Sequence, residues 1–191
     1  MILTLTVLTA ASDGRYVPDL MPYDPFAPRA PGERRYWLVK TEPETFSFND
    51  LLAAPNQTTT WDGVRNPIAR NFLRDGMKKG DRAFFYHTGD EKAIVGICEV
   101  VREGYPDPTA LDRKHDHFDP KSKAEAPMWY MVDVKAVTPV PRPVTLAEIK
   151  QRKEFADMPL VRVGRLSVSP VSPGQWKSLC TIGKVDATLA K

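Results

Sequence analysis

The sequence predicts an α+β fold in which a small curved or closed sheet packs against short helices. Short, strongly apolar strand candidates alternate with capped helix candidates from Arg35 onward. The strands also follow one another in hairpin-like succession, and no Gly-x-Gly-x-x-Gly motif follows any of them. A doubly wound parallel sheet is therefore disfavoured.

The strand candidates are apolar segments that lie between turn signals. They are residues 36–39, 58–61, 82–87, 93–101 and 128–137. The third and fourth are separated by the turn-rich residues 88–92, which predicts a hairpin. The last is the longest strand signal in the chain.

The helix candidates each begin at a side chain that can cap a helix. Ser47 precedes the first, and Asn66 followed by Pro67 opens a second that Gly76 is placed to stop. Thr145 and Glu148 have the spacing of a capping box for a helix to about Lys153. Ser172 and Gln175 have it for a final helix that closes near Gly183.

Composition limits the classes of function. A chain of 191 residues with 42% hydrophobic and 27% charged residues suits one ordinary globular domain. The net charge of +3 permits a polyanionic partner without demanding one. Cys98 and Cys180 form no Cys-x-x-Cys pair, so neither a zinc knuckle nor a disulfide framework is indicated. A reducing, cytoplasmic location fits best.

The N-terminus differs from the rest of the chain. Residues 1–11 are apolar, but no Lys or Arg precedes them and they are too short to span a bilayer. Residues 12–34 have the proline-rich, polar composition of a linker. We expect residues 1–34 to form a disordered or loosely docked extension, residues 35–184 to form the domain, and residues 185–191 to form a tail. No association with a membrane is expected.

Catalytic motifs are missing. The chain has no zinc-deaminase ligand set, Gly-x-Ser-x-Gly, His-Glu-x-x-His or phosphate-binding Gly-Lys-Ser/Thr loop. His115-Asp116-His117 followed by Asp119 resembles a metal cluster, but its polar surroundings favour a solvated loop. We expect no catalytic residue, no metal and no cofactor.

The segment TTTWDGVRNPIARNFL, residues 58–73, combines a tryptophan with several arginines. An indole face stacks on a nucleobase with a gain of about 1–3 kcal/mol. The helix that begins at Pro67 exposes backbone N–H groups, and Arg65, Arg70 and Arg74 supply guanidinium groups suited to phosphate. These features describe a nucleotide pocket. A core tryptophan beside a solvated helix face explains the same residues equally well.

Longer motifs resemble a known family. YWLVKTEPETFSF at residues 36–48 resembles the opening motif of the EVE domain, and residues 58–88 resemble its most recognisable block. WYMVDVKAV and LVRVGRLSVSPVSPGQW match the remaining landmarks, so the resemblance covers residues 35 to about 182. It implies a PUA-like fold, a small β-barrel of about five to six strands with flanking short helices, related to the YTH readers of N-methylated adenine.

The resemblance also implies a binding module that accepts a modified base, chiefly a modified cytosine in DNA and also RNA bases, in an aromatic-lined pocket. The motif positions that it assigns to the pocket are Trp37, Lys40, Thr41, Trp61, Asp62, Val64, Arg65, Asn66, Arg165, Leu166 and Ser167.

In the mechanism that follows, one modified base leaves the stack and enters the pocket. Trp61 would stack on the base, while Lys40, Thr41 and Asn66 would contact its polar edge. Arg65, Arg70 or Arg165 would hold the flanking phosphates. His87 ends a strand near the expected pocket mouth, so it is either a base contact or a strand-end residue with structural partners. Trp129 and Trp176 are expected in the core.

Two other functions remain open. PUA-like folds also host enzymes that act on nucleic acids or nucleotides. The chain could instead be an interaction module of a defence or modification system, with a protein partner bound through its N-terminal extension. For the reader function, we expect a monomer whose partner is nucleic acid with a modified base.

Overall fold

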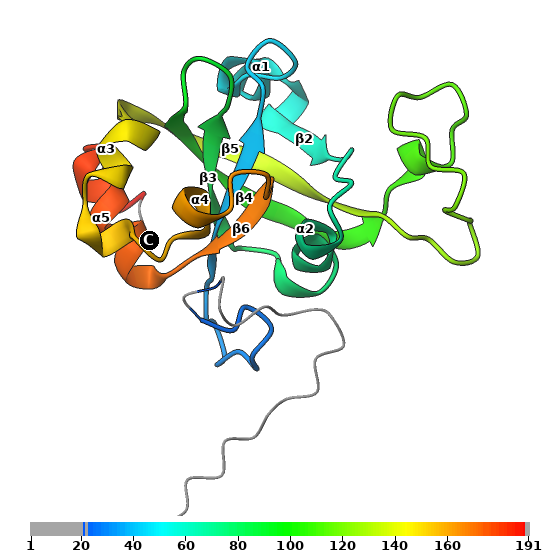
Figure 1. Ribbon diagram of the computed structural model, residues 1–191, viewed down its shortest axis with the longest axis horizontal. Coiled ribbons are helices and arrows are strands. Elements are labelled where there is room, and N and C mark those ends of the chain that lie inside the picture. Colours follow the sequence, from blue (N-terminus) through cyan, green and yellow to red (C-terminus); the bar gives the residue numbers. More distant parts are fainter. Residues whose placement is uncertain (1–20, 22, 190–191) are drawn as a thin grey trace, which may run out of the picture.

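A single six-stranded sheet organises the computed structural model, which describes Met21 and residues 23–189 (Figure 1). The strands lie in the order β2-β5-β4-β3-β1-β6. Their bounds are β1 Tyr36–Thr41, β2 Thr58–Trp61, β3 Arg82–His87, β4 Ala93–Pro106, β5 Tyr130–Thr145 and β6 Val168–Val171. The five predicted strands are confirmed. Strand β6 was not predicted as a strand because it is short and contains a proline.

The predicted α+β class is confirmed, with a sheet that is mixed and open. β1 pairs with β3 in parallel, whereas the other pairs, including the predicted β3–β4 hairpin, are antiparallel. The long strands β4 and β5 pair with several shifts of register, which curve a sheet. In the described residues β2 and β6 remain at opposite edges, so the backbone pairing does not close a barrel.

Short helices surround the sheet, and the predicted caps are present. Ser47, Asn66, Thr145 and Ser172 each accept hydrogen bonds from backbone N–H groups of the helix that follows. The α-helices are α1 Phe48–Ala53, α2 Pro67–Asn71, α3 Leu146–Lys150, α4 Pro159–Arg162 and α5 Pro173–Ile182. A π-helical turn, η3 Phe72–Gly76, continues α2, and 3₁₀ turns lie at η2 Pro55–Gln57, η4 Pro108–Ala110 and η5 Lys153–Phe155. None of the helices in this described part of the chain could cross a membrane.

The core lies on both faces of the sheet because neighbouring residues of a strand point to opposite sides. On one face Trp37 and Phe85 pack with Trp61, and on the other Phe84 packs with Trp176. The rings of Phe84 and Trp176 are stacked with centroids 4.0 Å apart, and Trp129 is also buried. Trp129 and Trp176 are therefore both buried, as the sequence predicted.

Residues 24–34 pack against the domain, which differs from the loose attachment expected from composition. The Arg29 guanidinium forms an ion pair with the buried Asp81 at 2.6 Å, and Phe26 stacks on Phe72. The Arg35 guanidinium donates hydrogen bonds to the carbonyl oxygens of Pro25 and Ala27. The rest of the predicted extension, residues 1–20 and 22, lies outside the described residues.

Candidate functional site

A solvent-open hollow of about 360 Å³ lies where β1 and β2 end. It combines aromatic rings with carboxylate, ammonium, imidazole and hydroxyl groups. Its lining residues are Lys40, Thr41, Thr45, Phe46, Thr59, Thr60, Trp61, Asp62, Gly63, Val64, Arg65, His117 and Ser167. "The hollow" below means this set.

The end of β1 supplies the cationic side of the hollow. The backbone N–H of Lys40 donates to the carbonyl of Ser167 at 2.9 Å, which holds the segment before β6 beside β1. The Lys40 ammonium donates to the carbonyl of Gly164 at 3.1 Å. Desolvation by burial lowers the pKa of Lys40 to about 8. Lys40 is therefore a cation near neutral pH that loses its charge in mildly alkaline solution.

The segment before β6 continues this wall. Arg165 is exposed and lines a shallow depression beside the hollow, together with Lys40 and Ser167. The Leu166 side chain is buried and lines the same depression. Of the three predicted site residues in this segment, Ser167 lines the hollow itself, whereas Arg165 and Leu166 line the adjacent depression.

The end of β2 supplies the aromatic and acidic side. Trp61 lines the hollow although only 7% of its surface is exposed, and its ring packs edge-on against Phe85 with centroids 5.4 Å apart. Asp62 follows, and its carboxylate accepts a hydrogen bond from the Thr60 hydroxyl at 2.9 Å. Val64 is buried and completes this wall.

His117 forms a further wall that the motifs did not predict. It lies above Gly63, where an added Cβ would come within 2.3 Å of the imidazole ring. Gly63 also has a φ of +72°, so glycine suits this position for two reasons. The His117 Nδ1 lies 3.5 Å from a carboxylate oxygen of Asp62. The polar neighbours of His117 favoured a solvated loop, and its contact with Gly63 was missed because the two residues lie more than fifty positions apart.

Arg65 lines the hollow and also contacts the loop that carries His117. Its guanidinium forms an ion pair with the buried Asp107 at 2.8 Å and donates to the carbonyl of His117. It also lies over the Trp129 ring at 5.3 Å. These partners hold the guanidinium in the wall of the hollow, and its contact with phosphate stays a prediction.

Asp107 is the acceptor at the centre of this connection. Burial opposes its ionisation, but hydrogen bonds from Thr109, Arg65 and the Gly63 N–H outweigh burial and lower its pKa. The carboxylate therefore stays charged and links the Asp-Gly turn after β2 to the loop after β4.

Asn66 and Arg70 lie outside the hollow. The Asn66 side chain caps α2 by accepting from the N–H groups of Ile68 and Ala69, so its carbonyl oxygen is committed to the helix. Arg70 donates to Asn71 and to the carbonyl of Met128. Neither residue lines the hollow, and their contacts with base or phosphate stay predictions.

Trp37 and His87 also lie apart from the hollow. Trp37 has no exposed surface, and its indole N–H donates to Asp81 at 2.8 Å. His87 is buried, with Nε2 accepting from the Phe48 N–H at 3.0 Å and Nδ1 2.5 Å from the Glu91 carboxylate. His87 is therefore a strand-end residue with structural partners, the second of the two roles considered for it.

Sequence reasoning missed several lining residues, namely Thr45, Phe46, Thr59, Thr60, Gly63 and His117. Phe46 stands inside the motif ETFSF, and the Thr41 hydroxyl donates to its carbonyl at 3.1 Å. That motif could have identified Phe46. The threonines of β2 were expected in a strand, but the sequence did not indicate which face of the sheet their side chains would occupy.

The described residues hold no group of three or more His, Cys, Asp or Glu side chains placed to bind a metal ion. Cys98 and Cys180 are both buried, and burial raises the pKa of each thiol to about 12.

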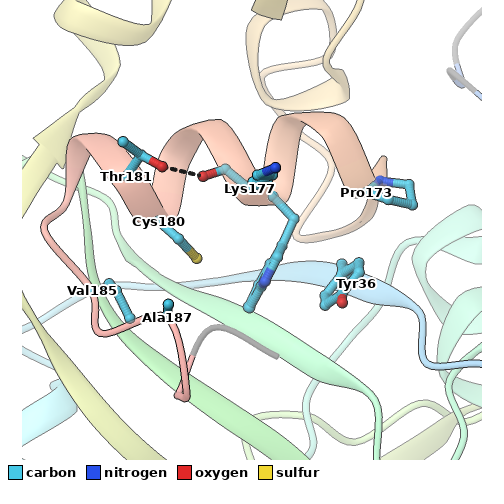
Figure 2. A pocket seen from close by; sticks show the side chains of 8 residues that line it. Tyr36, Pro173, Lys177, Cys180, Thr181, Val185 and Ala187 are labelled. Atoms are coloured by element: carbon cyan, nitrogen blue, oxygen red, sulfur yellow. Dashed lines mark hydrogen bonds between the residues drawn. The ribbon is translucent and has the colours of Figure 1, made fainter.

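A second hollow of about 380 Å³ has a different character. It lies between α5, the start of β1 and the segment after α5 (Figure 2). Its lining is largely apolar and includes Tyr36, Trp176, Cys180 and Val185, with Lys177 along one side. It lacks the convergent polar groups that orient a ligand, so we place the candidate site at the first hollow.

The sequence matches a family model and several known proteins. The family model described as "EVE domain" matches residues 35–182. Thymocyte nuclear protein 1 of Danio rerio is 42% identical over 168 residues, which cover 78% of this chain and 72% of the relative. The human protein of that name is 43% identical over 159 residues, covering 74% and 70%.

Solved structures agree in fold. Human thymocyte nuclear protein 1, in complex with DNA that contains 5-methylcytosine, has a TM-score of 0.75 and 39% identity, covering 80% of this chain and 99% of that one. A protein from Pseudomonas syringae has a TM-score of 0.73 and 42% identity, covering 78% and 99%.

Proposed function

We propose that this chain, which belongs to the EVE domain family, binds DNA carrying a modified cytosine and holds the modified base in the hollow. The observation that carries the proposal is the hollow itself, where Trp61, Asp62 and Lys40 meet. The human relative's complex with 5-methylcytosine DNA supports the class of partner.

The polar groups of the hollow match the edge of a cytosine. Cytosine offers an amino group that donates, and carboxylates accept from that group in protein–DNA contacts. Asp62 provides such an acceptor, while Lys40 and the hydroxyl of Ser167 can donate to the ring's acceptors. Thymine carries an oxygen in place of the amino group, so it would face Asp62 with an acceptor.

The base must leave the duplex to reach these groups. Extrusion costs a few kcal/mol, and stacking on an aromatic ring returns about 1–3 kcal/mol. Trp61 and the half-buried Phe46 are the aromatic side chains that line the hollow beside His117. Because stacking and hydrogen bonds must together offset extrusion, we expect modest affinity for one modified base.

In this proposal the chain reads the base and does not change it. An enzyme that acts on the same base is the alternative from the sequence, and it would alter the mass of the bound oligonucleotide. The human relative is called a nuclear protein, and its solved complex contains DNA. Neither comparison supports RNA binding or a cytoplasmic location, so these two remain predictions.

The test is equilibrium binding to matched duplexes that differ at one position, which holds cytosine, 5-methylcytosine or thymine, at one salt concentration. We expect the duplex with 5-methylcytosine to bind most tightly. Asp62→Asn should reduce the ratio of the affinity for the 5-methylcytosine duplex to that for the thymine duplex by about tenfold. Asp90→Asn, an exposed turn residue, is the matched control. Equal affinity for the three duplexes would refute the proposal.

A further inference from the structure

Two depressions adjoin the hollow at Lys40, and we call them the outer depressions. The first is the depression lined by Arg165 that is described above, with a volume of about 230 Å³. The second has a volume of about 170 Å³ and is lined in part by Lys92. Lys40, Thr88 and Gly164 line both, so the two depressions adjoin each other as well as the hollow.

The lining of the outer depressions carries more positive than negative charge. Its cations are Lys40, Lys92 and Arg165, and its one carboxylate belongs to Glu42. Lys92 and Arg165 are exposed, and none of the three cations forms an ion pair with a described residue. The lining therefore has an excess of two positive charges and lacks the counter-ions that would neutralise them.

The wall that carries Arg165 belongs to a segment without carboxylates. Residues 158–185 contain no Asp or Glu, and they contain four cations, namely Arg162, Arg165, Lys177 and Lys184. The net charge of the whole chain is +3, so this segment holds more than the entire excess. Glu44, Asp90 and Glu91 lie on loops that border the outer depressions but line neither of them, and the Glu91 carboxylate contacts the His87 Nδ1.

The position of the outer depressions matters because a base in the hollow stays joined to its sugar and phosphates. The strand must therefore cross the rim of the hollow. Lys40, Thr41 and Ser167 line both the hollow and the first outer depression, so one part of the rim is shared with a cationic surface. Lys and Arg side chains neutralise phosphates, and such contacts position a strand without reading its sequence.

We propose that the outer depressions form a phosphate subsite, in which Lys92 and Arg165 contact backbone phosphates next to the extruded nucleotide. This inference rests on the proposed function and deepens it, because it assigns the side on which the strand leaves the hollow. The sequence predicted a phosphate contact for Arg165 but not for Lys92. The subsite adds affinity for any sequence, whereas the hollow provides the selectivity for the base.

The test combines a neutral phosphate in the DNA with removal of the two cations in the full chain. Duplexes with one 5-methylcytosine carry a single methylphosphonate, an uncharged phosphate analogue, at each position that flanks the modified base in turn. At one or more positions we expect the affinity of the wild type to fall about tenfold. K92Q/R165Q should bind those duplexes and the unmodified parent duplex equally well. Its slope of log affinity against log salt should be smaller by about 1 to 2.

The matched control, K177Q/K184Q, removes the same charge from exposed positions of the same carboxylate-free segment. It should respond to methylphosphonate as the wild type does, and circular dichroism on heating verifies the fold of both variants. Equal losses in the wild type and in K92Q/R165Q, no loss in the wild type, or no binding of duplex by the wild type would overturn the subsite.

The preference for 5-methylcytosine over cytosine is measured in the same titrations. Its absence would refute the hollow as the site of the base. A methylphosphonate effect that requires Lys92 and Arg165 would still stand in that case, so failure of the hollow and failure of the subsite are distinct results.

Discussion

Trp61 serves the core and the hollow with one ring. It packs against Phe85 and belongs to the core cluster on its side of the sheet, yet it also lines the hollow. Removal of a buried tryptophan costs about 3–5 kcal/mol of stability. An alanine variant therefore mixes a loss of binding with a loss of fold.

We predict that Trp61→Phe weakens binding of methylated DNA about fivefold with a small change in melting temperature, because a smaller ring keeps the core contact and loses stacking area. Trp176→Phe, in the cluster on the opposite face, should leave affinity unchanged. Fluorescence anisotropy with one labelled duplex measures both. Equal effects of the two substitutions would show that Trp61 acts through the core alone.

Lys40 predicts how binding depends on pH. Its pKa of about 8 lies below that of a free lysine because burial disfavours the charged form. As pH rises through 8 the amine becomes neutral, so binding that needs the ammonium should weaken by about tenfold per pH unit above 8. Affinity measured between pH 6.5 and 9.5 tests this.

Lys40→Arg is the control, since a guanidinium keeps its charge throughout this range. Its binding curve should be flat with pH. The same decline in this variant as in the wild type would assign the titration to another group.

At the scale of elements, the sequence predicted the parts that depend on local chemistry. Strand β2 and the capped starts of α1, α2 and α5 agree with prediction, because each is specified by residues within a few positions of one another. The pairing of the Arg65 guanidinium with Asp107 was not predicted, because the two residues lie forty-two positions apart in the chain. Such long-range pairs leave no pattern in a single sequence, and for the same reason His117 was missed.

The connection between Asp107 and Arg65 predicts that the loop between β4 and β5, residues 107–129, and the hollow respond together. We expect Asp107→Asn to lower the free energy of unfolding by about 3 kcal/mol, because it leaves a partly buried guanidinium without its charge partner. Hydrogen exchange should rise in residues 107–129 and in the turn at Gly63. Asp112→Asn, at an exposed position of the same loop, is the control. Unchanged exchange at Gly63 would contradict the connection.

At the scale of the whole molecule, the domain includes more chain than the family motifs cover. Asp81 has 1% of its side chain exposed and accepts hydrogen bonds from Arg29, the Trp37 indole and the N–H groups of Arg35 and Lys78. Met21 and Phe26 cover the core beside it. Composition predicted a linker here, because a proline-rich segment has the same composition whether it packs against a domain or not.

We predict that a chain of residues 35–191 is about 3 kcal/mol less stable than one of residues 21–191, because truncation removes the partner of a buried carboxylate and uncovers Phe72. The melting temperature should fall by about 6–12 °C. Arg29→Gln in the longer chain should reproduce part of this loss. Equal melting temperatures would show that residues 24–34 contribute nothing to the fold.

In the proposed complex, the hollow receives a base that has left the duplex. A crystal structure of the chain bound to a duplex with one 5-methylcytosine tests it most directly. We expect density for that base in the hollow, against the Trp61 ring and with its amino group donating to the Asp62 carboxylate. A base that stays stacked in the duplex, or a duplex bound to another face of the domain, would contradict it.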